Sequence, residues 1–129
     1  MNADSPSDGH LNDLTERVIG AIFEVSNTLG AGFLEKVYER ALVRELALRG
    51  IRAESQVPFC ATYKGHAVGD YFADILVENV LVLELKCVEH LRPEHTAQCL
   101  NYLKATGLHL CLLVNFQQPK VEWKRLVLS

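Results

Sequence analysis

The stretch from Tyr71 to Lys86 constrains the fold most strongly, because it has the pattern of a β-hairpin that carries charged side chains. Two runs rich in Ile, Leu and Val flank a turn signal at residues 78–79. Asp74 lies in the first run, and Glu84 lies in the second, two residues before Lys86. Because side chains alternate along a strand, Glu84 and Lys86 are expected to point to the same face of the sheet.

The length of the loop decides whether Asp74 shares that face. A two-residue loop would place Asp74 opposite Leu83, on the wrong face. A three-residue loop, residues 78–80, would pair Val77 with Leu81 and set Asp74 across from Glu84. We predict the three-residue loop, because asparagine in the turn tolerates the left-handed conformation that such loops use. This register also makes one fully apolar face, which consists of Ile75, Val77, Leu81, Leu83 and Leu85.

In this register Asp74 and Glu84 are cross-strand neighbours with Cβ atoms roughly 5 Å apart. Two carboxylates at that separation repel each other unless a cation lies between them. A divalent ion of the Mg²⁺ type suits the site, since it takes one or two carboxylates together with waters and phosphate. Lys86 alone could also supply the positive charge, and the trio would then be an ion-paired patch on an exposed sheet face. The spacing leaves both interpretations open.

The remaining chain predicts an α/β sandwich with a mixed sheet flanked by helices, in the order α-α-β-β-β-α-β-β. A crossover helix between the hairpin and a nearly continuous apolar run implies a parallel strand connection. Asn12 or Asp13 is a candidate cap for the first helix. The expected helices are 13–29, 33–49 and 93–105, and the expected strands outside the hairpin are 53–57 with 58–63, 108–115 and 121–128.

The bulk properties predict one ordinary globular domain. The length of 129 residues and the 49% apolar content suit a single core over residues 11–129, with residues 1–10 as a disordered tail. No apolar run is long enough to cross a membrane, and the four dispersed cysteines are expected to be buried, which predicts a cytoplasmic protein. The net charge of −3 counts against a strong, sequence-independent grip on nucleic acid.

Polar residues on two helices are further candidates. Glu35 follows a glycine-rich corner at the start of the second helix, with Tyr38 one turn later. A carboxylate there either stabilises the helix start or reaches the hairpin as a third acidic group. In the third helix Gln98 and Tyr102 lie on one stripe with His95. That stripe is either the solvated side of the helix or a cover over the end of the strand that carries Lys86.

Asp74, the run Glu84-Leu85-Lys86, and Gln98 with Tyr102 resemble the signature of the PD-(D/E)XK nuclease superfamily with its downstream Q-x-x-x-Y helix. The run from Gly32 to Tyr38 also resembles the motif of the small GxxExxY protein family. The likeness covers nearly the whole chain beyond the first ten residues. This sequence differs from the pattern of the GxxExxY family at Phe72, where that family commonly has arginine, and at Ser26, where it commonly has histidine.

The resemblance implies a restriction-endonuclease-like, three-layer core and a metal-dependent nuclease that hydrolyses DNA or RNA. It implies that Asp74 and Glu84 hold Mg²⁺ or Mn²⁺, that Glu35 supplements the metal ligands, and that Lys86 activates the attacking water. Gln98, Tyr102 and Tyr38 would support this site. The alternative is a nuclease-fold module that no longer cuts and that binds nucleic acid or a protein partner. A homodimer also suits so small a domain.

Overall fold

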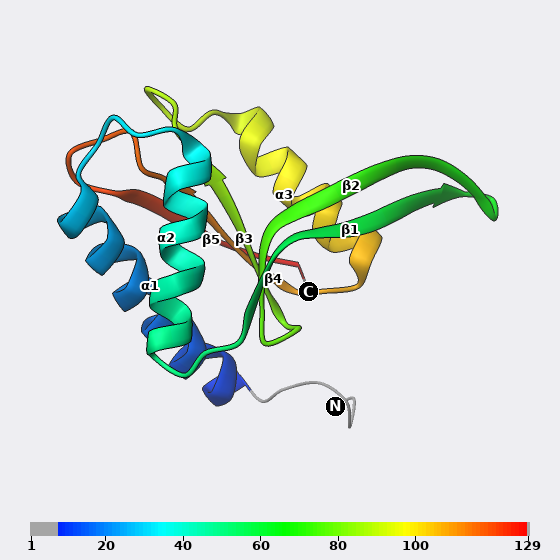
Figure 1. Cartoon of the computed structure of the whole chain (residues 1–129). Helices are drawn as coiled ribbons and strands as arrows, with labels where there is room; N and C mark the ends of the chain where they lie inside the picture. The colour runs from blue at the N-terminus through cyan, green and yellow to red at the C-terminus, as the bar shows by residue number, and fades with distance from the viewer. Residues whose placement is uncertain (1–7, 129) are drawn as a thin grey trace.

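The computed structural model describes residues 8–128, and its elements follow the predicted order (Figure 1). A single sheet has the strand order β1-β2-β3-β4-β5. Neighbouring strands are antiparallel except β3 and β4, which are parallel because α3 connects them. The elements are α1 (Asp8–Leu29), α2 (Glu35–Leu48), β1 (Ala53–Tyr63), β2 (His66–Val77), β3 (Leu81–Lys86), α3 (Pro93–Thr106), β4 (Leu110–Asn115) and β5 (Glu122–Val127).

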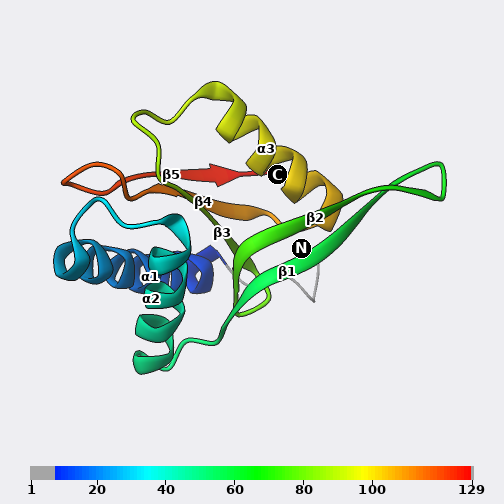
Figure 2. The same cartoon turned by 45° about the horizontal axis from the view of Figure 1, so that its top comes forward.

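The sheet is the middle of three layers. Helices α1 and α2 cover one face and α3 covers the other, as Figure 2 shows. The larger core lies under α1 and α2, where the predicted apolar face of the hairpin, from Ile75 to Leu85, is fully buried. A smaller core joins α3 to the opposite face through Val82, Leu113 and Leu103. The predicted three-layer α/β architecture, a mixed sheet flanked by helices, is therefore confirmed.

The hairpin has the predicted three-residue loop. Val77 pairs with Leu81, and Glu78 and Asn79 both have left-handed backbones, with φ of 51° and 59°. The Val80 N–H donates to the Val77 carbonyl at 3.0 Å. This loop is also tied to the start of β1, because the backbone N–H of Arg52 donates to the Glu78 carboxylate at 2.8 Å.

The first helix begins earlier than expected. It starts at Asp8, so residues 8–10 of the predicted tail are helical and neither Asn12 nor Asp13 caps the helix. The extra turn forms because Leu11 packs against the main core, one turn before Leu14. Residues 1–7 lie outside the described part of the chain. None of the described helices has the length and apolar character needed to cross a membrane.

Strands β1 and β2 form a long hairpin that leaves the sheet as an arm (Figures 1 and 2). The two predicted extended segments form one strand, which contains a left-handed residue at Gln56, with φ of 53°. The turn of the arm lies at Lys64-Gly65. Because β2 is much longer than β3, its first half has no partner on the β3 side.

Candidate active site at a fork in the sheet

The site lies where β2 separates from β3. Their pairing runs from Val77 with Leu81 to Ile75 with Leu83, and the next position in the same register sets Asp74 across from Glu84. There the Leu85 backbone N–H donates to Oδ2 of Asp74 at 2.7 Å. The carboxylate thus satisfies a backbone donor at the point where the strands diverge, and this bond fixes Asp74 beside β3.

Glu84 and Lys86 point toward α3, as the alternation of β3 predicts. They line one side of a pocket of about 310 Å³ that opens in the fork. Gln98 and Tyr102 line the same pocket, so the polar stripe of α3 does fold over this end of the strand. The other lining residues are Tyr71, Phe72, Cys99 and Asn101. The structure therefore brings together both residues predicted on α3 and two of the three charged residues of the hairpin.

His95 has a different position. Its Nδ1 accepts a hydrogen bond of 3.0 Å from the Arg92 backbone N–H at the start of α3. The cysteines also differ from expectation, because Cys99 and Cys111 are buried whereas Cys60 is exposed. Tyr102 lies nearer the end of α3. Its pKa is raised by desolvation and by the charge of Glu84.

The carboxyl groups of the site are harder to ionise than ordinary ones. Burial raises the pKa of Glu84 to about 8, and the charge of Asp74 adds to this effect. Burial also raises the pKa of Asp74, against the opposing effects of the Leu85 N–H and of Lys86. The pKa of Glu35 is raised by desolvation and then by Asp74. Lys86 lowers all three of these pKa values and Lys36 also lowers that of Glu35, yet all three stay raised, so the site favours a further cation.

Glu35 approaches the site from α2, on the opposite side of the sheet from α3. It is the first residue of the helix, and a glycine-rich corner precedes it. Tyr38 secures this corner, since its hydroxyl donates to the Gly30 carbonyl at 2.6 Å and accepts from the Phe33 N–H at 3.2 Å. Its ring stacks on Phe116 with centroids 4.5 Å apart. Tyr38 is thus buried behind the site and does not line the pocket.

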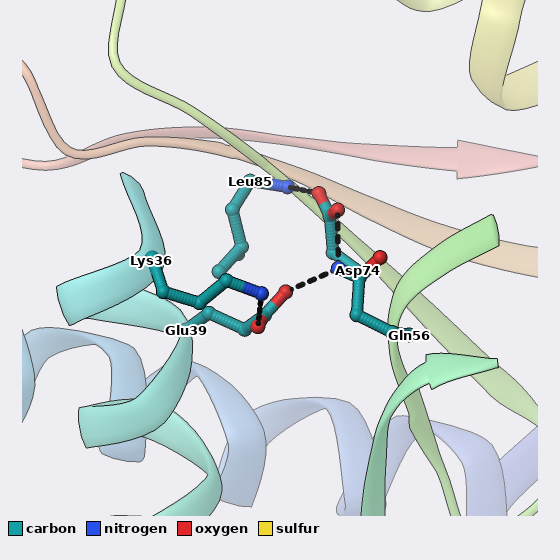
Figure 3. A network of polar contacts seen from close by, with 5 residues as sticks. All are labelled: Lys36, Glu39, Gln56, Asp74 and Leu85. Carbon is teal, nitrogen blue, oxygen red and sulfur yellow. Dashed lines mark hydrogen bonds and ion pairs between the residues drawn. The ribbon is translucent and has the colours of Figure 1, made fainter. Parts of the chain in front are cut away.

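Two residues that the sequence analysis did not single out join the site (Figure 3). Glu39 is only 4% exposed and pairs with Lys36 at 2.9 Å. The amide of Gln56 donates to Glu39 at 2.6 Å and lies 3.5 Å from Oδ1 of Asp74. Glu39 also contributes to the raised pKa of Asp74. The sequence contained a signal that Glu39 is buried. It precedes Leu42 by three residues and Leu46 by seven, which places it on the buried stripe of α2.

The metal shell of Asp74, Glu84 and Glu35 stays a prediction. Among the described residues no group of three His, Cys, Asp or Glu side chains is arranged to hold a metal ion. Asp74 and Glu84 still fit Mg²⁺ or Mn²⁺, because Mg²⁺ binds through one or two carboxylates and completes its octahedron with waters and substrate phosphate.

A fold of this kind with acidic residues and a lysine at the fork defines a nuclease-like α/β protein. Residues 12–126 match the family model described as the PD-(D/E)XK nuclease superfamily, so the chain belongs to that superfamily. No curated protein matches the chain.

Two solved structures share the fold. The crystal structure of SSO0001 aligns with a TM-score of 0.58 and 18% identity over 72% of this chain, which spans half of that protein's length. The alkaline exonuclease LHK-Exo from Laribacter hongkongensis aligns with a TM-score of 0.52 and 15% identity, over 97% of this chain and 72% of that protein. At these identities the likeness concerns the fold alone.

Proposed function

We propose that this protein is a metal-dependent nuclease that hydrolyses phosphodiester bonds in DNA or RNA. The observation that carries the proposal is the meeting of Asp74, Glu84 and Lys86 at the fork, in a chain of the PD-(D/E)XK superfamily. LHK-Exo, which has the same fold, is described as an alkaline exonuclease, and this supports phosphodiester hydrolysis as the reaction. The run Gly32 to Tyr38 further supports membership of the narrower GxxExxY family.

In this proposal Asp74 and Glu84 hold Mg²⁺ or Mn²⁺, and Glu35 contributes from α2. When bound, such an ion lowers the pKa of water and neutralises charge that develops on the phosphate. Since the pKa of Glu84 is raised to about 8, its carboxyl group releases a proton when it becomes a ligand near neutral pH. Glu84 therefore makes metal binding stronger as the pH rises toward 8.

The roles of the remaining residues follow from their positions in the pocket. Lys86 lies beside Glu84 and stabilises the negative charge that develops on the phosphate in the transition state. Gln98 and Tyr102 lie across the pocket on α3, where their amide and hydroxyl groups donate hydrogen bonds to phosphate oxygens. Tyr38 acts at a distance, by holding the corner that places Glu35.

One observation favours the alternative of a nuclease-fold module that binds without cutting. Phe72 occupies the position where the resembling family commonly has arginine, and its side chain is 55% exposed at the pocket. A phenylalanine there supplies no charge for a phosphate. Under this alternative nucleic acid or a protein partner would still bind in the presence of a chelator, and no metal concentration would produce cleavage.

Calorimetric titration with Mn²⁺ and Mg²⁺ tests the proposal, together with cleavage of mixed DNA and RNA on the same preparations. Wild type should bind metal saturably and Asp74→Asn should not, whereas the exposed control Asp70→Asn should bind as wild type does. Lys86→Met should retain metal binding and lose cleavage, and Lys120→Met should retain both. Absence of metal binding by wild type would overturn the proposal, and metal binding without cleavage of any substrate would select the alternative.

A further inference from the structure

Two aromatic rings are exposed at the pocket that holds Glu84 and Lys86. Tyr71 is 54% exposed and Phe72 is 55% exposed, and both line this pocket from β2. We propose that they bind the base of an unpaired nucleotide next to the phosphate at Lys86, so that the substrate is single-stranded nucleic acid. This inference rests on the proposed nuclease function and names its substrate class.

The two sides of the pocket match the two parts of a nucleotide. The β3 side carries the charged groups Glu84 and Lys86, and the β2 side carries the rings of Tyr71 and Phe72. Phe72 on β2 and Lys86 on β3 both lie beyond the last pair of the two strands, Ile75 with Leu83, and both line the pocket at the fork. A phosphate at Lys86 thus shares its pocket with two exposed aromatic rings, on which any of the bases can stack.

A second hollow continues the pocket along the arm. It has a volume of about 220 Å³ and shares Tyr71, Asn101 and Tyr102 with the first. Ala61 on β1 and Ala105 at the end of α3 complete its lining. The two hollows therefore adjoin each other between the arm and α3, and the second, which Lys86 does not line, is where this inference places the neighbouring nucleotide.

The arm carries few positive charges, so it is suited to binding nucleic acid by base stacking rather than by neutralising phosphates. From residue 53 to residue 77 the arm contains one lysine, Lys64, and three acidic residues, Glu54, Asp70 and Asp74. A duplex is held mainly by cations along its backbone, which this arm does not supply. In a duplex, moreover, the bases are stacked on each other, and a base reaches a protein ring only when it leaves the stack. A single strand avoids the second obstacle, because its bases are free to stack on the rings, and its backbone carries fewer phosphates per unit length than a duplex.

Fluorescence anisotropy with short labelled oligonucleotides in Ca²⁺ buffer, and again with a chelator, tests this inference. The probes are single-stranded DNA, single-stranded RNA and the matching duplex. Either single strand should bind more tightly than the duplex. Tyr71→Ala and Phe72→Ala should each weaken single-strand binding roughly 5- to 150-fold, the range measured for base–aromatic stacking. Tyr63→Ala is the matched control, since Tyr63 is exposed on the arm but lines neither hollow.

Two further variants separate stacking from general apolar contact. Phe72→Leu keeps an apolar side chain but has no ring and should bind weakly, whereas Phe72→Trp should bind at least as well as wild type. An oligonucleotide that lacks the base at the position bound by Tyr71 and Phe72 should bind wild type more weakly by the same factor. Its affinity should not change further in Phe72→Ala.

These experiments test the base-binding subsite of Tyr71 and Phe72 separately from the nuclease activity. Ring-dependent single-strand binding without cleavage would support the subsite and overturn the nuclease. Cleavage of duplex and single strand alike, unchanged by Phe72→Ala, would support the nuclease and overturn the subsite. A change of oligomeric state in Phe72→Ala, with nucleic-acid binding intact, would also overturn the subsite and assign the rings to contact with a second copy of the chain.

Discussion

The backbone N–H of Leu85 donates to the carboxylate of Asp74 at 2.7 Å, across the point where β2 and β3 separate. In a regular sheet a main-chain carbonyl of the neighbouring strand would accept that bond. Asp74 therefore has two roles, because it closes the end of the ladder and also carries one of the charges of the site. A substitution that removes its oxygen atoms affects both roles, whereas one that removes only the charge affects the second.

The first prediction compares Asp74→Asn with Asp74→Ala. Asparagine keeps an oxygen that can accept from the Leu85 N–H and removes a charge that raises the pKa of Glu84. Alanine leaves the Leu85 N–H without this acceptor, which costs about 1–3 kcal/mol. In urea unfolding at neutral pH we expect Asp74→Ala to be less stable than Asp74→Asn by about that amount, and both to lose Mn²⁺ binding. Equal stability of the two variants would contradict a structural role for the bond.

The second prediction concerns the pH dependence of the metal-free protein. Because the pKa of Glu84 is raised from 4.5 to about 8, this group contributes stability that is fully present below pH 4.5 and is lost as the pH rises through 8. Glu84→Gln removes the titration, so its stability relative to wild type should increase by a few kcal/mol between pH 5 and pH 9, at about 1.4 kcal/mol for each unit of pKa. Thermal unfolding across this range measures the difference.

Metal and a matched variant provide the controls for this pH profile. Saturating Mn²⁺ should remove much of the loss in wild type, because the ion stabilises the ionised carboxylate, and should change Glu84→Gln little. Glu54→Gln, at an exposed position on the arm, should follow the wild-type profile. A wild-type stability curve parallel to that of Glu84→Gln would show that Glu84 ionises normally.

Local sequence patterns were sufficient to predict the centre of the site. Alternation along β3 places Glu84 and Lys86 on one face, and the asparagine in the turn favours the loop that sets Asp74 opposite Glu84. The crossover helix with its Gln98 and Tyr102 follows directly along the chain, so its position over the strand was also predictable. Each of these inferences uses residues close in sequence or a short-range repeat.

The surroundings of Asp74 could not be predicted in this way, because the alternation breaks there. Ala73 packs on the α3 side of the sheet and Ile75 on the α2 side, although the two residues are only two apart on β2. Gln56 takes a left-handed backbone next to this position, and its contact with Glu39 joins residues 17 apart in sequence. The change of side between Ala73 and Ile75 and the left-handed backbone of Gln56 occur together at the fork, and no local sequence pattern encodes them.

The third prediction tests the amide of Gln56. Gln56→Glu replaces a donor that contacts both Glu39 and Asp74 with a third acceptor, while the length of the side chain stays the same. At neutral pH we expect a loss of about 1–3 kcal/mol in the free energy of unfolding, with recovery in acid as the carboxyl groups are protonated. Chemical unfolding at the two pH values measures this. Gln117→Glu, at an exposed position, should change neither value, and a loss of stability in Gln56→Glu that persists in acid would exclude charge repulsion as its cause.

The fourth prediction links a buried hydroxyl to the metal. Tyr38→Phe keeps the ring that stacks on Phe116 and removes the hydroxyl that bridges Gly30 and Phe33. The loss of these bonds should cost about 1–2 kcal/mol of stability. Because the corner places Glu35, we also expect weaker Mn²⁺ binding by calorimetry, although residue 38 lies outside the pocket. Tyr63→Phe, on the exposed arm, should alter neither quantity. Reduced stability with unchanged Mn²⁺ affinity would remove Glu35 from the metal ligands and leave Asp74 and Glu84 as the pair that holds the ion.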